Sequence, residues 1–187
     1  MSLRYAILGL LAGGELSGYE LTRRFSDTVG YFWNARAQQI YPELARLEEA
    51  GLIAGRTVHQ VGRPDKRLYS LTPAGLADLT AWVTTPSPAT LTKDEFLVKV
   101  WSYGLAQPAA ALAALREHRR QHHERLAAYR AIEAHFGGVP PGQLPREFLG
   151  PYLTLRAGIR FEEAFLAWAD EAEAVLFARA NPPAHTD

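Results

Sequence analysis

Residues 38–53 read QQIYPELARLEEAGLI, and this stretch decides the fold. Its apolar residues recur at helical spacing and Gly51 ends the pattern, so we predict a short amphipathic helix. A basic hairpin is expected next, because two strand-like runs flank the turn sequence GRPDKR at residues 62–67. A helix with polar groups at its exposed start, beside a cationic hairpin, suits a DNA major groove and its flanking phosphates. The combination predicts a winged helix-turn-helix.

The composition limits the class of protein. The chain has 187 residues, of which 48% are hydrophobic, enough for one domain or two small ones with real cores. No apolar run approaches the ~20 residues that span a bilayer, and the N-terminus lacks the pattern of a secretory signal. We therefore expect a cytoplasmic protein with no membrane partner. The absence of cysteine excludes disulfides, thiolate metal sites and a cysteine nucleophile.

The charge is balanced overall but uneven along the chain. Basic and acidic residues number 20 each, and a net charge of zero by itself argues against nucleic-acid binding. The predicted hairpin is different, because its only acid, Asp65, stands against Arg56, Arg63, Lys66 and Arg67. We expect a local positive field there. A charged hairpin that is merely solvated is the alternative.

Local signals place further helices around the opening stretch. Apolar residues recur at helical spacing over residues 3–11, and Ser17 with Glu20 has the spacing of a capping box that opens a second helix. Thr72 and Pro73 supply the N-cap and first residue of a helix after the hairpin. The sequence TPSP at residues 85–88 then breaks the pattern. A winged helix-turn-helix DNA-binding domain is therefore expected over residues 1–85.

The start of the predicted recognition helix carries the candidate base contacts. Pro42 is tolerated in a first helical turn, which places the start near Gln38 or Gln39. Both glutamines can bond adenine bidentately, and Tyr41 can reach a phosphate or a base. Arg36 precedes them, and Arg46 lies further along, where it could touch the DNA backbone. The alternative is that the glutamines are ordinary polar surface residues.

The chain resembles the PadR family of bacterial transcriptional regulators in six segments: AILGLL (6–11), LSGYEL (16–21), YFWN (31–34), QIYPEL (39–44), GRP (62–64) and YSLT (69–72). The resemblance implies a homodimer that binds an inverted repeat in double-stranded DNA. It also implies a repressor, often released by a small aromatic or cationic apolar compound. It places Tyr19 near DNA, together with Gln38, Gln39 and Tyr41, and residues 63–67 in the wing.

Residues 91–180 are predicted to form an all-helical dimerisation and possible effector domain, which makes the chain mainly α with a two-stranded β wing. The spacing of Thr92 and Glu95 opens one helix, and others are expected over about 108–136 and 151–180. The last is apolar on two faces. One carries Leu155, Ile159 and Leu166, and the other carries Phe161, Phe165, Trp168 and Val175. Such a helix needs cover. We assign the first face, with Gly158 for close approach, to a dimer interface; a monomer's core helix is the alternative.

Aromatic residues near the module boundary are candidates for binding a small aromatic or apolar effector: Trp33, Phe96, Trp101 and Trp168. Rings that simply fill cores are the alternative. His118 and His122 lie four residues apart on one helix face, but without cysteine or an evident acid partner we predict no metal site. We expect these histidines at the surface or in an interface, and we expect no cofactor.

Motifs of catalysis are absent from the sequence. It has no phosphate-binding glycine loop, nucleophile elbow or zinc-binding helix motif, so we predict that the chain is not an enzyme. The main rival is a protein–protein adaptor that keeps a winged-helix scaffold without DNA binding. Outward-facing cations at Arg63, Lys66 and Arg67 would favour DNA binding over that rival.

Overall fold

The computed structural model describes residues 2–28, 37–60, 62, 65–88 and 93–181. The chain divides into two compact units, residues 1–89 and 90–187. The predicted domains, residues 1–85 and 91–180, fall within these units. Among the described residues, no helix combines the length and the apolar character needed to cross a membrane.

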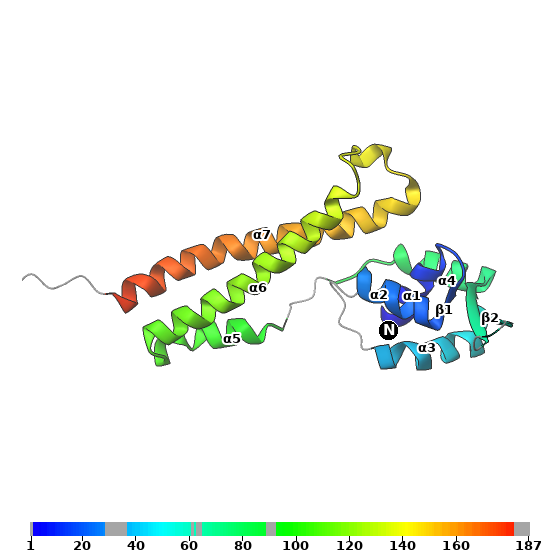
Figure 1. The fold of residues 1–187 in the computed structure, drawn as a ribbon, viewed down its shortest axis with the longest axis horizontal. Helices are drawn as coiled ribbons and strands as arrows, with labels where there is room; N and C mark the ends of the chain where they lie inside the picture. The colour runs from blue at the N-terminus through cyan, green and yellow to red at the C-terminus, as the bar shows by residue number, and fades with distance from the viewer. Residues whose placement is uncertain (1, 29–36, 61, 63–64, 89–92, 182–187) are drawn as a thin grey trace, which may run out of the picture. The chain divides into compact units, whose positions relative to one another are not determined.

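The N-terminal unit is a winged helix-turn-helix. Its elements are α1 (Ser2–Leu11), β1 (Leu16–Ser17), α2 (Gly18–Asp27), α3 (Ala37–Glu49), β2 (Ile53–Val58), β3 (Lys66–Leu71) and α4 (Pro73–Val83) (Figure 1). Strands β2 and β3 form the predicted antiparallel hairpin, with Ile53 opposite Leu71 and Val58 opposite Lys66. The sheet has a third strand, because Leu16 of β1 pairs with Tyr69. A strand of two residues leaves no periodic signal in a sequence.

Side-chain caps begin α2 and α4 as predicted. The Ser17 hydroxyl accepts a hydrogen bond from the Glu20 backbone N–H at 3.2 Å, and the Glu20 carboxylate accepts one from the Ser17 backbone N–H at 2.8 Å. Thr72 caps α4 by accepting from the Gly75 N–H at 3.1 Å. Helix α3 begins at Ala37, so Pro42 lies in its second turn rather than its first and removes one backbone hydrogen bond.

The core of the N-terminal unit is built by helices α1, α2 and α3 with strands β1 and β2, and Leu79 of α4 packs against it. Its buried members are Ile7, Leu8, Leu11, Leu16, Leu21, Phe25, Ile40, Leu44, Leu47 and Ile53. Helix α4 approaches the turn between α3 and β2 so closely that a Cβ at Gly75 would lie 2.0 Å from the Leu52 carbonyl oxygen. Only glycine permits this contact, which fixes α4 beside the base of the hairpin.

The C-terminal unit is a long helical hairpin with a short helix beside it. Its elements are α5 (Glu95–Trp101), the 3-10 turn η2 (Tyr103–Leu105), α6 (Pro108–Ala134), the 3-10 turn η3 (Pro141–Gln143) and α7 (Arg146–Ala180) (Figure 1). Asp94 caps α5 by accepting hydrogen bonds from two backbone N–H groups, whereas the expected cap, Thr92, lies outside the described residues. Helix α7 starts about a turn before the predicted Pro151, which the helix accommodates near its beginning.

Candidate nucleic-acid interface

Helix α3 presents a polar face at its N-terminal end because its apolar face is buried. Ile40, Leu44 and Leu47 have 2% exposure or less, and their spacing leaves Gln38 and Gln39 exposed. Further along, the Arg46 guanidinium lies 3.1 Å from Glu43 and remains largely exposed. Arg36 lies outside the described residues.

Two exposed tyrosines flank the contact between α2 and α3. Tyr41 is 54% exposed and Tyr19 is 71% exposed, so both hydroxyls can reach a partner. The Tyr41 ring packs on the start of α2, where a Cβ at Gly18 would lie 2.7 Å from Tyr41 Cε1. Gly18 therefore lets the two helices of the helix-turn-helix meet through an aromatic ring that keeps its hydroxyl near the surface.

We call β2, β3 and the turn between them (residues 53–71) the wing, and its described cations are paired within the chain. Lys66 Nζ lies 2.8 Å from Glu20 Oε1, and Arg67 Nη2 lies 2.6 Å from Glu48 Oε1. Arg56 pairs with Glu15. Arg63 lies outside the described residues. The expected positive field is therefore reduced, because these carboxylates come from outside the hairpin and the charge count along its own sequence missed them.

The Glu20 carboxylate is fixed by two partners at once. The hydrogen bond from Lys66, followed by those from Ser17, lowers the pKa of Glu20 to about 2. Glu20 is thus ionised at neutral pH and ties the start of α2 to the wing. On the other side, Glu48 Oε1 accepts from the Gly55 N–H at 3.0 Å as well as from Arg67. The end of α3 is thereby tied to the same hairpin.

The face of α7 that we predicted for dimerisation is packed inside the chain itself. Ile159 has no exposed surface and Leu166 is 7% exposed, because α6 covers them. A Cβ at Gly158 would lie 2.9 Å from the Tyr129 ring of α6. Leu155 is half-buried. Ile159 and Leu166 are therefore core residues of this hairpin rather than a free surface.

A second apolar face of α7 is exposed. At about 100° per residue, the exposed residues Leu149, Leu153, Phe161 and Val175 fall in one sector, roughly opposite Ile159 and Leu166. Phe161 and Val175 are 57% and 63% exposed. Both belong to the second face that the sequence showed.

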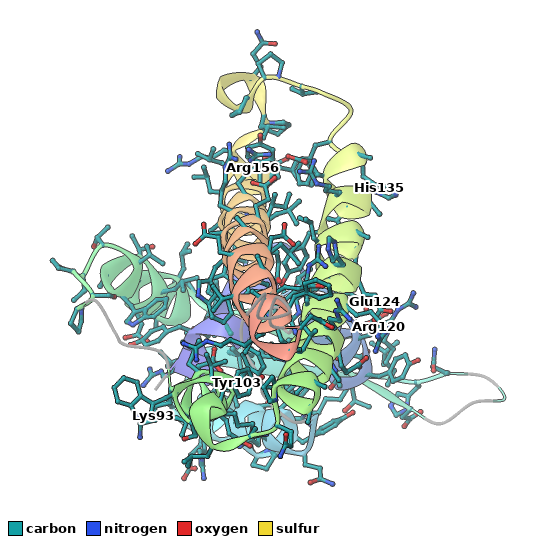
Figure 2. All side chains as sticks on the ribbon, turned by 90° about the vertical axis from the view of Figure 1, so that its left-hand side faces the viewer. Lys93, Tyr103, Arg120, Glu124, His135 and Arg156 are labelled. Atoms are coloured by element: carbon teal, nitrogen blue, oxygen red, sulfur yellow. The ribbon has the colours of Figure 1, made fainter. Side chains whose placement is uncertain are left out.

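Two of the predicted effector residues, Phe96 and Trp168, lie in one aromatic cluster. Phe96 of α5 stacks on His118 with the ring centres 3.8 Å apart, and it meets Trp168 edge to face with the ring centres 6.3 Å apart. Tyr103 of η2, labelled in Figure 2, meets Phe96 edge to face with the ring centres 6.4 Å apart. Its buried hydroxyl has no hydrogen-bond partner within the described part of the chain. Trp101 is 91% exposed and outside the cluster, and Trp33 is not among the described residues.

A buried polar network lies beneath this cluster. His122 is 5% exposed and donates a hydrogen bond from Nδ1 to Glu162 of α7, which is 2% exposed and also pairs with Arg125 at 3.1 Å. The Nε2 atoms of His122 and His118 are 3.2 Å apart, and burial lowers the pKa of His118. The expectation of surface or interface histidines is therefore wrong for His122, which is buried. Its burial is possible because Glu162 is an acid partner, which the sequence did not reveal. Among the described residues, no cluster of three metal ligands occurs.

These features define a winged-helix DNA-binding protein with a helical C-terminal domain. The model of the PadR-like transcriptional regulator family matches residues 7–81, and that of the virulence activator α C-terminal family matches residues 92–176. The chain is 37% identical over 186 residues to the probable transcriptional regulator Rv1176c of Mycobacterium tuberculosis, covering 94% of this chain and 98% of the relative.

Bacillus subtilis PadR, a negative transcriptional regulator, is 33% identical over 177 residues, covering 93% of this chain and 97% of that protein. Its structure with operator DNA matches with a TM-score of 0.85 and 32% identity, covering 94% of this chain and 99% of that one. Its structure with p-coumaric acid matches with a TM-score of 0.81 and 30% identity, covering 95% and 99%. The chain therefore belongs to the PadR-like family of transcriptional regulators, which are DNA-binding proteins and not enzymes.

Proposed function

We propose that this chain acts in the cytoplasm as a homodimeric repressor that binds an inverted-repeat operator in double-stranded DNA. The observation that carries the proposal is the α3 surface, where Gln38, Gln39 and Tyr41 are exposed beside a buried apolar face. Tyr19 and the wing cations Lys66 and Arg67 flank that surface. The B. subtilis relative is a negative regulator that has been solved with operator DNA, which supports repression. The pairing of Lys66 and Arg67 with carboxylates weakens the charge argument against the adaptor alternative, so DNA binding is favoured by the relative solved with operator DNA.

The operator is found by selecting bound fragments from random duplex DNA, and a palindrome is the expected product. Replacing Gln38 or Gln39 with alanine is then expected to cost ~1–3 kcal/mol at particular base pairs, because a bidentate contact to adenine is lost. Replacing Arg46, which is largely exposed, with alanine is expected to weaken binding to every duplex, because phosphate contacts carry no sequence information. Competition titrations with single-base variants of the operator measure the difference. Identical, sequence-independent losses in both sets would contradict these roles.

We propose that the chain dimerises through the exposed apolar face of α7. This face, which we call the outer face, carries Leu149, Leu153, Phe161 and Val175. An exposed apolar stripe along a long helix needs a partner, and a second copy of the chain presents the same stripe. A twofold dimer also matches the palindrome, because the spacing of two recognition helices has to match the spacing of two half-sites.

We further propose that a small aromatic ligand weakens operator binding by entering the cluster around Phe96 and Trp168. The relative solved with p-coumaric acid supports this class of ligand, and the unpartnered Tyr103 hydroxyl can hydrogen-bond it. With p-coumaric acid as the probe, calorimetry is expected to show binding, and operator affinity is expected to fall ~5–150-fold.

Two variants test where the ligand binds. Phe96→Ala is expected to abolish both binding and the loss of operator affinity, whereas Trp101→Phe, at an exposed residue outside the cluster, should leave both unchanged. If Phe96→Ala bound the ligand and lost operator affinity as the unaltered chain does, the cluster would be excluded as the binding site.

A further inference from the structure

Two carboxylates beside the DNA-binding surface have the geometry of specificity determinants. We propose that Glu48 and Glu20 make binding selective by holding the wing cations Arg67 and Lys66 until the recognition helix is seated in its groove. The inference rests on the proposed DNA binding and deepens it, because it concerns how the chain avoids DNA that is not its operator.

The ion pair between Glu48 and Arg67 is anchored by a hydrogen bond to the backbone of β2. Glu48 Oε1 accepts from Arg67 Nη2 at 2.6 Å and from the Gly55 N–H at 3.0 Å. A Cβ at Gly55 would lie 2.5 Å from Glu48 Oε1 and 2.7 Å from Arg67 Nε. A side chain at position 55 would therefore force the pair to move. Tyr69 adds to the arrangement, because the Arg67 guanidinium lies 5.8 Å from its ring centre.

The Lys66 pair repeats the arrangement with a carboxylate of α2. Glu20 holds Lys66 Nζ at 2.8 Å while it also accepts hydrogen bonds from Ser17. The side chains of both pairs are between 30% and 48% exposed, so water and a phosphate can reach the cations. Each pair links the wing to one helix of the helix-turn-helix: Glu20 belongs to α2 and Glu48 to α3.

The pairing turns each phosphate contact of Lys66 or Arg67 into an exchange of one anion for another. Such an exchange is favoured when the rest of the interface keeps a phosphate beside the cation, because the effective local concentration is then high. On a duplex that α3 cannot read, the complex is loose and is held mainly by phosphate contacts. The competing carboxylates therefore weaken non-specific binding more than operator binding, which is how a repulsive element creates selectivity.

The test uses the full chain, its selected operator and a scrambled duplex of the same length and composition, titrated by fluorescence anisotropy at several salt concentrations. Glu48→Gln retains an oxygen that accepts from Gly55 but loses the charge. We expect it to bind the scrambled duplex ~3–10-fold more tightly, with a log–log salt slope steeper by ~0.9, as for one additional phosphate contact. Operator affinity should rise by a smaller factor, so the ratio of the two affinities falls.

The matched control is Glu49→Gln, which removes the same charge from the neighbouring exposed residue. It should change both affinities by one factor and leave their ratio intact. The double variant Glu48→Gln with Arg67→Gln should lose the gain on scrambled DNA. An unchanged ratio for Glu48→Gln, or a fall in both affinities with an unchanged slope, overturns the inference. If the unaltered chain binds no duplex, the proposed function itself fails.

Discussion

Replacing Glu162 with alanine is expected to lower the free energy of unfolding of the C-terminal unit by ~3–5 kcal/mol, because removal of one partner strands the others in a buried polar network. Glu162 is 2% exposed and holds His122, which is 5% exposed. It also neutralises Arg125, whose guanidinium lies 3.1 Å away. Alanine would leave a histidine with an unpaired ring nitrogen and a cavity between α6 and α7. Calorimetric unfolding of the full chain, with the two units followed as separate transitions, measures the loss.

A rescue variant separates the ionic network from simple packing. Changing His122 and Glu162 together to leucine removes both buried polar groups, and such replacements of a buried pair are often neutral or stabilising. Arg125 is 45% exposed and can turn to water. The double variant is therefore expected to recover most of the stability lost in Glu162→Ala. A loss below ~1 kcal/mol for the single variant would show that the pair is not isolated from solvent.

The fold of the N-terminal unit was predictable because its signals are local. A capping box at Ser17, an N-cap at Thr72, a stop at Gly51 and turn residues at 62–65 each act within a few residues, and the helices and hairpin began or ended close to these signals. The short strand β1 was missed, because it exists only through its pairing with Tyr69 in β3.

The electrostatics of the candidate site could not be predicted in the same way. Along the chain, Asp65 is the one acid within the stretch that carries the wing's cations, whereas folding brings Glu15, Glu20 and Glu48 to the hairpin. Glu20 is separated from Lys66 by 46 residues in the chain. Counting charges along a segment describes the unfolded chain well and the folded surface poorly, because tertiary contacts decide which charges are neighbours.

Helix α7 shows a related limit. Its sequence revealed two apolar faces, which was right, but periodicity does not say which face meets α6. Packing decided this, because the face of Ile159 and Leu166 carries Glu162 and can therefore satisfy the buried His122. On the other face, Phe161 and Val175 are left exposed, whereas Phe165 and Trp168 join the aromatic cluster. That assignment leads to the prediction with the largest functional effect.

Replacing Phe161 with glutamate is expected to abolish the proposed homodimer and to weaken operator binding by ~10²–10⁴-fold. Phe161 is 57% exposed on the outer face of α7, so the substitution leaves the core of the hairpin intact while placing two like charges at a twofold contact. Two linked recognition helices gain this factor over one because the second half-site is bound as an intramolecular event. Sedimentation gives the assembly state, and titration of operator and half-site duplexes gives the loss.

Val139→Glu is the matched control, since Val139 is 41% exposed in the connection between α6 and α7, away from the outer face. It should remain dimeric and bind the operator normally. The affinity of Phe161→Glu for a single half-site should also be retained, because α3 and the wing lie in the other unit. A Phe161→Glu protein that still sediments as a dimer would exclude this face as the interface, and an unaltered chain that is monomeric at micromolar concentration would exclude the dimer itself.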